Sequence, residues 1–287
     1  MNLINPTNST NLINLSREMH SIFHRDQTKM NNIGKDELNL ADLPFAIVSR
    51  RQQESRSTIK YLKNFPYTQE WIVAGSSRYG LPTEFDERVF ITLLAITKRQ
   101  NFCSRQVFFK VSNVLGLMQI DKIGGYQYRS FTHSLERLTG VTITARGLFW
   151  DNSEERYIPL IKGFHIIDEY QLKCTGVDDN YIVWSQILWR SFESGYMKDL
   201  NLAFFFSLKK PLSRRLYRLL DKRLQDNDKE SFDLLDLGRR MGMDYNYPSE
   251  IARKIRLAAG ELKFKGFLKN YRISKNKFTA VNLSTDR

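Results

Sequence analysis

The sequence predicts an α+β protein in which two tandem winged-helix domains follow a disordered N-terminal tail. A winged helix is a helix-turn-helix unit that carries a C-terminal β-hairpin, the wing. Three observations predict this fold: a polar first segment, an order of helices and strands that occurs twice, and positive charge concentrated in the second occurrence. We expect the tail at residues 1–40, the first domain at 41–176 and the second at 177–287.

The predicted tail is dominated by Asn, Ser, Thr and Asp, and its apolar residues are scattered. Such a segment buries too little apolar surface to offset the entropy lost on folding. The ordered body is expected to begin at the apolar run Leu43–Val48. Aromatic and β-branched residues in Ser57–Val73 then predict strands.

A central helix is predicted directly after Pro82 and Thr83. Its first turn holds three acidic residues, which suit the positive end of the helix dipole, and Lys98 and Arg99 suit the other end. Apolar residues occupy more than one face, so we expect this helix to be buried.

Shorter elements complete the predicted first domain. Gln106–Phe109 indicates a strand, Val111–Leu115 a brief helix, and a second amphipathic helix ends at Gly140. Val141–Trp150 and Tyr157–Tyr170 have the composition of strands and are separated by a polar turn. We expect these two strands to form the first wing.

The same order occurs again in the second domain. A helix at Leu212–Leu224 is followed by a strand at Ser231–Leu235 and a brief helix that ends near Met243. A longer helix is expected at Ser249–Phe264, and Phe267–Leu283 is typical of a hairpin.

Glycines mark this repeat. Gly116 and Gly140 are 24 residues apart, and so are Gly242 and Gly266, which lie 126 residues later. The matching order of elements favours a duplicated unit. Chance is the alternative, because glycine ends many unrelated helices.

The charge balance points to a polyanionic partner. Lys and Arg total 44 against 31 acidic residues, so the formal net charge is +13. Such a field attracts nucleic acid or an anionic membrane. The segment from Pro248 to Lys277 holds nine Lys or Arg and two Glu, a net +7 that is more than half of the excess. Double-stranded DNA is therefore the expected partner of the second domain.

The placement of these cations on the predicted helix Ser249–Phe264 sharpens this expectation. At ~100° per residue, Ile255 and Leu262 fall on the side opposite Arg253 and Arg256. Arginine can bond guanine in the major groove, and lysine can neutralise phosphate. A solvated basic face without a partner is the alternative. The residues expected to contact DNA are Ser249, Arg253, Lys254, Arg256, Gly260, Lys263, Arg272, Lys275 and Lys277.

A second basic cluster lies at the start of the second domain. Its long side chains either contact the DNA backbone or are merely solvated. The residues are Lys209, Lys210, Arg214, Arg215 and Arg218. The third helix of the first domain is less basic, with Glu136 among Arg129, His133 and Arg137, which favours self-association or auxiliary DNA contact there.

The sequence lacks the common catalytic, metal-binding and cofactor-binding motifs. The four histidines are dispersed, without the His-x-His pair of a metal-dependent nicking enzyme, and neither a P-loop nor a GxGxxG motif is present. Two widely spaced cysteines form neither a disulfide framework nor a zinc site, and no apolar run approaches the ~20 residues of a membrane span. We expect a cytoplasmic protein that is not an enzyme, with no catalytic residues, metal, cofactor or membrane partner.

Several stretches together resemble the replication initiator protein A family of bacterial plasmids. They are LPFAIV at Leu43–Val48, Gly80–Thr83, Leu138–Ile143 and Pro211–Arg218. The resemblance extends over roughly residues 43–270. It implies a bacterial protein that starts plasmid replication by binding repeated origin sequences, called iterons.

The resemblance also implies roles for the two domains. In related initiators the second winged helix reads DNA, and the first serves dimerisation and additional DNA contact. Monomers start replication with host initiator and helicase-loading proteins, while dimers repress the initiator's own gene or restrain copy number. A transcriptional regulator without initiation activity is the alternative that the sequence leaves open.

Overall fold

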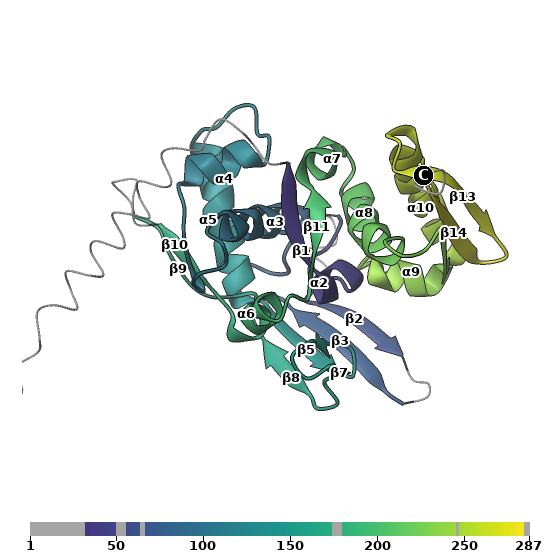
Figure 1. The fold of residues 1–287 in the computed structure, drawn as a ribbon, viewed down its shortest axis with the longest axis horizontal. Coiled ribbons are helices and arrows are strands. Elements are labelled where there is room, and N and C mark those ends of the chain that lie inside the picture. Colours follow the sequence, from purple (N-terminus) through teal and green to yellow (C-terminus); the bar gives the residue numbers. More distant parts are fainter. Residues whose placement is uncertain (1–31, 50–55, 64–66, 174–179, 245–246, 284–287) are drawn as a thin grey trace, which may run out of the picture. The chain divides into compact units, whose positions relative to one another are not determined.

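The computed structural model describes residues 32–49, 56–63, 67–173, 180–244 and 247–283. From Ile33 onward the described residues belong to one unit of mixed helices and strands, so the predicted α+β character is confirmed (Figure 1). None of the helices in these ranges is both long and apolar enough to cross a membrane.

The ordered chain starts earlier than predicted. Strand β1 (Ile33–Glu37) pairs antiparallel with β11 (Met197–Asn201) along its whole length, and the short helix α2 (Leu38–Asp42) follows. The prediction of a tail through residue 40 is therefore wrong for residues 33–40, while residues 1–31 lie outside the described residues. Composition misled here because Asp36 and Glu37 are buried polar residues whose partners come from distant segments.

Helix α3 (Glu84–Arg99) is the central element that the sequence predicted. Thr83 begins it with a capping box, in which its backbone N–H donates to the Asp86 carboxylate at 2.5 Å. Most of its residues are buried, and the Phe90 ring lies edge-on to the rings of Phe45 and Trp184. Because α3 is buried on several faces, its own apolar residues occupy more than one face.

A segment of helices and strands extends from α3 along the chain. After α3 come β4 (Gln106–Phe108), α4 (Val111–Leu117) and α5 (Gly125–Gly140). Strands β9 (Ile167–Gln171) and β10 (Tyr181–Trp184) then pair antiparallel, and β4 joins them in the order β4-β10-β9.

A later segment has the same order of elements, apart from the strands that lie between α5 and β9 in the first. After α8 and β12 come α9, α10 and the paired strands β13 and β14, and the sheet order is β12-β14-β13. Position by position, this order matches β4-β10-β9. The bounds are α8 Pro211–Arg223, β12 Lys229–Asp233, α9 Leu234–Arg240, α10 Pro248–Phe264, β13 Leu268–Ser274 and β14 Lys277–Asn282.

The first predicted hairpin is present but belongs to a larger sheet. Strand β5 (Thr142–Arg146) pairs with β3 (Gln69–Ala74) and β8 (Lys162–Phe164), in a sheet of order β2-β3-β5-β8 with β2 at Thr58–Lys63. The predicted strands Val141–Trp150 and Tyr157–Tyr170 do pair with each other, through β5 with β8, but β5 also pairs with β3, and the end of the second predicted strand forms β9, which pairs with β10. Local strand propensity identified these strands and their pairing, but not the additional partner β3 or the pairing of β9 with β10.

The predicted boundary between residues 176 and 177 falls between β9 and β10, and both flanking residues lie outside the described ranges. Because Tyr170 pairs with Ile182 across that hairpin, the first segment extends at least to Trp184. Two small antiparallel strands, β6 (Trp150–Asp151) and β7 (Arg156–Tyr157), and the helices α6 (Gln186–Glu193) and α7 (Leu202–Ser207) complete the fold.

The glycine pairs that suggested a repeat are not equivalent. Gly242 and Gly266 have φ of +70° and +77° and follow the ends of α9 and α10. Gly116 lies within α4 and Gly140 is the last residue of α5, and neither has a positive φ. The two segments correspond in their order of elements, but not at the fixed offset of 126 residues.

Candidate nucleic-acid interface

Helix α10 is seated on its neighbours through one apolar side. Ile251, Ile255 and Leu262 are buried, and the helix packs against α8, α9 and β13. Gly238 of α9 allows a close approach, because a Cβ there would lie 2.7 Å from Cδ1 of Ile251. The seating side is the one that the helical periodicity predicted.

The opposite side of α10 carries exposed cations. Arg253, Arg256 and Lys263 are exposed, as are Ser249 at the first turn and Lys275 and Lys277 of the β13–β14 hairpin. Within the described ranges, neither Arg253 nor Arg256 forms an ion pair. The two guanidinium groups are therefore available to a ligand, whereas Lys254 and Gly260 are half-buried.

A groove separates α10 from β13, which run alongside each other in Figure 1. Its volume is about 440 Å³. The Lys263 ammonium donates to Oδ1 of Asn270 at 2.9 Å, and the Tyr271 hydroxyl donates to the Arg256 carbonyl at 3.3 Å. The lining includes three cations and no carboxylate: Arg256, Gly260, Lys263, Asn270, Tyr271, Arg272 and Ile273. The structure thus brings Arg272 of the hairpin together with Arg256 and Lys263 of the helix.

Two apolar residues of this surface were missed in the sequence. Leu257 is 52% exposed and Phe264 is 90% exposed. Both lie on the side of α10 that carries Arg253, at spacings of four and eleven residues from it. The helical spacing was the signal that could have found them.

The second basic cluster is largely internal, which corrects the expected contact with DNA. Arg214, Arg215 and Arg218 are buried and pair with carboxylates of earlier segments. Arginines in such pairs cannot reach a phosphate. Lys209 and Lys210 are exposed, and their backbone N–H groups donate to the Glu261 carboxylate.

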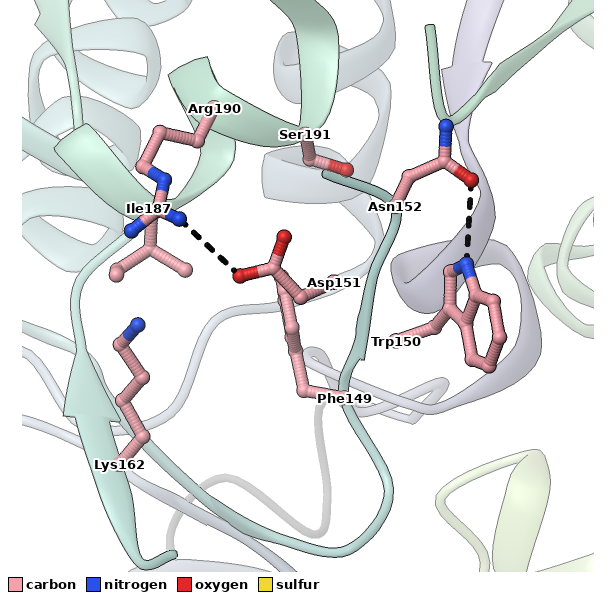
Figure 2. A pocket seen from close by; sticks show the side chains of 8 residues that line it. All are labelled: Phe149, Trp150, Asp151, Asn152, Lys162, Ile187, Arg190 and Ser191. Atoms are coloured by element: carbon pink, nitrogen blue, oxygen red, sulfur yellow. Dashed lines mark hydrogen bonds and ion pairs between the residues drawn. The ribbon is translucent and has the colours of Figure 1, made fainter. Parts of the chain in front are cut away.

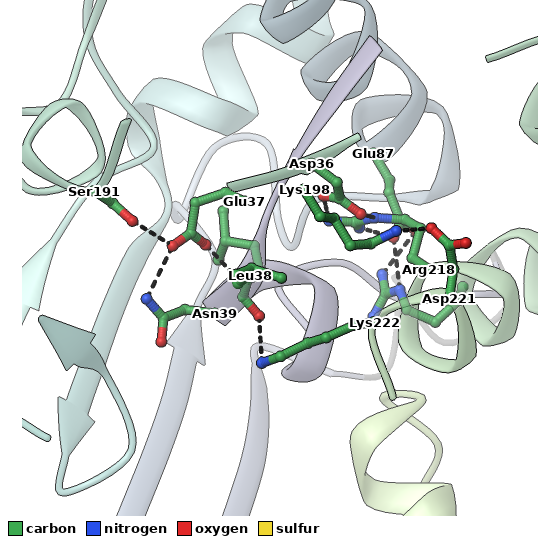
Figure 3. A network of polar contacts seen from close by, with 12 residues as sticks. Asp36, Glu37, Leu38, Asn39, Glu87, Ser191, Lys198, Arg218, Asp221 and Lys222 are labelled. Atoms are coloured by element: carbon green, nitrogen blue, oxygen red, sulfur yellow. Dashed lines mark hydrogen bonds and ion pairs between the residues drawn. The ribbon is translucent and has the colours of Figure 1, made fainter. Parts of the chain in front are cut away.

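The centre of this internal network is the pair of carboxylates Asp36 and Glu87 (Figure 3). The Arg218 guanidinium bonds to both of them, and Arg215 donates to Glu87 at 2.7 and 2.8 Å. Burial raises the pKa of Glu87, but the charges of Arg215 and Arg218 outweigh it and lower that pKa to about 2. Beside them, Lys198 pairs with Asp221.

The third helix of the first segment, α5, offers fewer free cations than α10. Arg137 forms two hydrogen bonds to the Asp86 carboxylate at 2.6 and 2.8 Å. Glu136 accepts from the Tyr79 hydroxyl at 2.7 Å, and Arg129 and His133 are exposed. This distribution agrees with the weaker basic character read from the sequence.

In a small pocket between β6 and α6, polar side chains of the lining bond to one another (Figure 2). Arg190 lies 3.4 Å from the Asp151 carboxylate, and the Trp150 indole donates to Oδ1 of Asn152 at 3.2 Å. Nowhere in the described residues do three or more His, Cys, Asp or Glu gather as a metal would require. Among the sites described, the exposed face of α10 and its groove are the best candidate for binding a ligand.

Comparisons with known proteins show a family and a similar fold. The model of the family described as replication initiator protein A matches residues 35–257. Crystal structures of domains 2 and 3 of RctB are similar in fold at 14% identity. One, a selenomethionine derivative, has a TM-score of 0.52 and covers 86% of this chain and 98% of its own. The other has a TM-score of 0.47, with 85% and 96% covered. No curated protein matches the chain.

Proposed function

The chain belongs to the replication initiator protein A family, and from that premise we propose that it starts plasmid replication by binding repeated origin sequences, iterons, in double-stranded DNA. The family match covers 223 of the 287 residues, from 35 to 257, and makes the chain a replication initiator. The repeats, the plasmid and the repression of its own gene are parts of the proposal.

The proposal assigns a winged helix to each of the two segments with the same strand order. The first extends from α3 to β10 and the second from α8 to β14. The second is the principal DNA reader, with α10 in the major groove and the β13–β14 hairpin as its wing. The first serves self-association and auxiliary DNA contact.

One observation carries this assignment. Helix α10 buries Ile251 and Ile255 on one side and exposes Arg253 and Arg256 on the other, without acidic partners among the described residues. Two arginines without described acidic partners, on a helix that is held in place by its buried side, suit recognition of guanine and phosphate. Arg214, Arg215 and Arg218 do not contribute, because their charges are already satisfied inside the protein.

The proposed action is not enzymatic. Binding energy at several repeats opens the adjacent duplex, and the bound initiators recruit host initiator and helicase-loading proteins. Self-association of the chain then sets a balance between monomers that start replication and dimers that repress.

A plasmid-maintenance experiment tests the function. A plasmid without a replicon receives this gene and its flanking DNA, which we expect to contain direct repeats of about 20 base pairs, or two helical turns. Stable maintenance is the expected result. The variant Arg253→Glu should abolish maintenance, while Lys60→Glu, a charge reversal at an exposed position of β2, should preserve it. Binding to the flanking DNA without maintenance would instead indicate a regulator.

A further inference from the structure

The exposed side of α10 consists of two rows with different surroundings. At ~100° per residue, Leu257 lies about 40° from Arg253 on one flank, and Arg256 lies about 60° away on the other. The Arg256 flank faces β13, because Tyr271 bonds to the Arg256 backbone and Lys263 bonds to Asn270. The row with Arg253 and Leu257 faces away from both the core and the hairpin.

We propose that α10 divides DNA recognition between these rows. Arg253 and Leu257 meet base edges, with Leu257 against the methyl group of a thymine, and the groove between α10 and β13 holds a phosphate of the DNA backbone. The proposal rests on the proposed function of α10 as the DNA reader. It assigns Arg256 to phosphate, whereas the sequence placed Arg256 beside Arg253 as a residue that reads bases in the major groove.

The groove has the chemistry of a phosphate site. Arg256, Lys263 and Arg272 surround it, and none of its lining residues is acidic. Gly260 lines the groove without a side chain. A Cβ at this position would occupy part of the groove and contact the Tyr271 hydroxyl at 3.6 Å. Cations in a concave site attract a phosphodiester without regard to base sequence.

The outer row has the chemistry of a base reader. Arg253 is exposed and without an ion pair in the described residues, and it can form two bonds to guanine. Leu257, one turn later, leaves half of its surface in water, and an apolar side chain in the major groove pairs with the thymine methyl. The two residues would therefore read neighbouring positions of the site.

The thymine contact is tested with a duplex that the full chain selects from a randomised library. Each thymine in that duplex is replaced in turn by uracil, which lacks only the methyl group. One replacement should weaken binding about fourfold, the value of a single buried methyl group. Leu257→Ala should weaken binding to the thymine duplex similarly and remove the sensitivity to that uracil. Leu160→Ala, at an exposed leucine outside α10, should leave the sensitivity intact.

The phosphate contact is tested with the same duplex and a scrambled one. Arg256→Ala and Arg272→Ala should weaken binding to both duplexes by the same factor, and each should lower the salt slope by about 1. Arg253→Ala should weaken only the selected duplex, by about 5- to 150-fold.

The outcomes distinguish failure of this division of α10 from failure of the proposed function. If the chain enriches no sequence and binds no duplex, the proposed function fails and the division fails with it. If a sequence is enriched but Arg256→Ala changes base preference, or Leu257→Ala retains the response to every uracil, the division of α10 is wrong and its role as reader stands.

Discussion

The guanidinium of Arg218 holds the carboxylate of Asp36 through two hydrogen bonds, Nε to Oδ2 at 2.8 Å and Nη2 to Oδ1 at 2.6 Å, with both side chains fully buried. The residues are 182 positions apart in the sequence. Together with Glu87, which Arg215 and Arg218 share, they tie β1 and α3 to α8. This network replaces the DNA contact that the sequence suggested for these arginines.

Removing one partner of this network should be costly. Arg218→Met leaves Asp36 without its two arginine hydrogen bonds and Glu87 with fewer bonds, and breaking a buried pair in this way costs about 3–5 kcal/mol. We expect that loss in the free energy of unfolding, measured by urea denaturation. Arg253→Met, an exposed arginine on α10, should stay within about 0.5 kcal/mol of the unchanged protein. Equal midpoints for the two variants would contradict this prediction.

Acid should weaken the same network through Glu87. Its pKa is about 2 in the folded protein, below the ordinary 4.5, because Arg215 and Arg218 outweigh the effect of burial. A carboxyl with a lowered folded pKa contributes stability above its unfolded pKa and loses it as the pH falls through the folded value. Glu87 therefore contributes fully above about pH 4.5, and its contribution disappears between there and about pH 2.

Unfolding midpoints measured between pH 7 and pH 2 check the contribution of Glu87. Glu87→Gln should be less stable than the unchanged protein at neutral pH, and the difference between the two should shrink through the acid window. The exposed Glu250 of α10 is a matched control, since Glu250→Gln should follow the unchanged protein. A constant difference across the window would refute the assignment to Glu87.

Cutting the chain at the boundary predicted from the sequence should prevent independent folding. A fragment of residues 177–287 begins between β9 and β10 and contains Arg215 and Arg218 without their carboxylates. We expect it to lack a cooperative thermal transition by circular dichroism. Co-expression with residues 1–176 should restore one, because the missing strand and carboxylates return. A fragment that melts cooperatively at the temperature of the full chain would show that the network is dispensable.

Substitutions on the two sides of α10 should affect different quantities, the buried side protein stability and the exposed side DNA binding. Ile255→Ala removes buried packing and should cost about 2–5 kcal/mol of unfolding free energy. Arg253→Ala should leave that free energy within about 0.5 kcal/mol while weakening specific DNA binding. Thermal melts and binding titrations of both variants make the comparison. Loss of stability in Arg253→Ala as large as in Ile255→Ala would mean that α10 is seated differently.

Salt should weaken DNA binding steeply. If the chain neutralises about six to ten phosphates, its affinity should fall about 10³- to 10⁵-fold between 50 and 200 mM salt. Equilibrium titrations of a labelled duplex over this range give the slope directly. A flat response would remove the electrostatic support for DNA as the partner, which rests on the net charge of +13.

The local sequence pattern was sufficient to predict several elements of the fold. The capped start of α3 at Thr83 and the buried side of α10 were readable because capping and helical periodicity depend on residues within a few turns. The same holds for the exposed Arg253, whose side of the helix follows from its spacing to Ile251 and Ile255.

Strand pairings between distant segments could not be predicted from the local sequence pattern. The strand β5 pairs with β8 as the sequence predicted, but it also pairs with the distant β3, and β9 pairs with β10 in a different sheet. A strand's own residues specify which face is buried and leave its partner to the rest of the fold.

The sequence by itself determined where the longer helices α3, α5, α8 and α10 lie, which side of α10 is apolar and where positive charge gathers. The tertiary structure alone decided which cations are free. Arg218 and Arg253 have the same side chain, and local charge patterns do not distinguish them. Arg218 is neutralised by Asp36 from β1, while no described carboxylate reaches Arg253. Burial of a charge depends on a counter-ion brought near by folding, and that distance in space is absent from the order of residues.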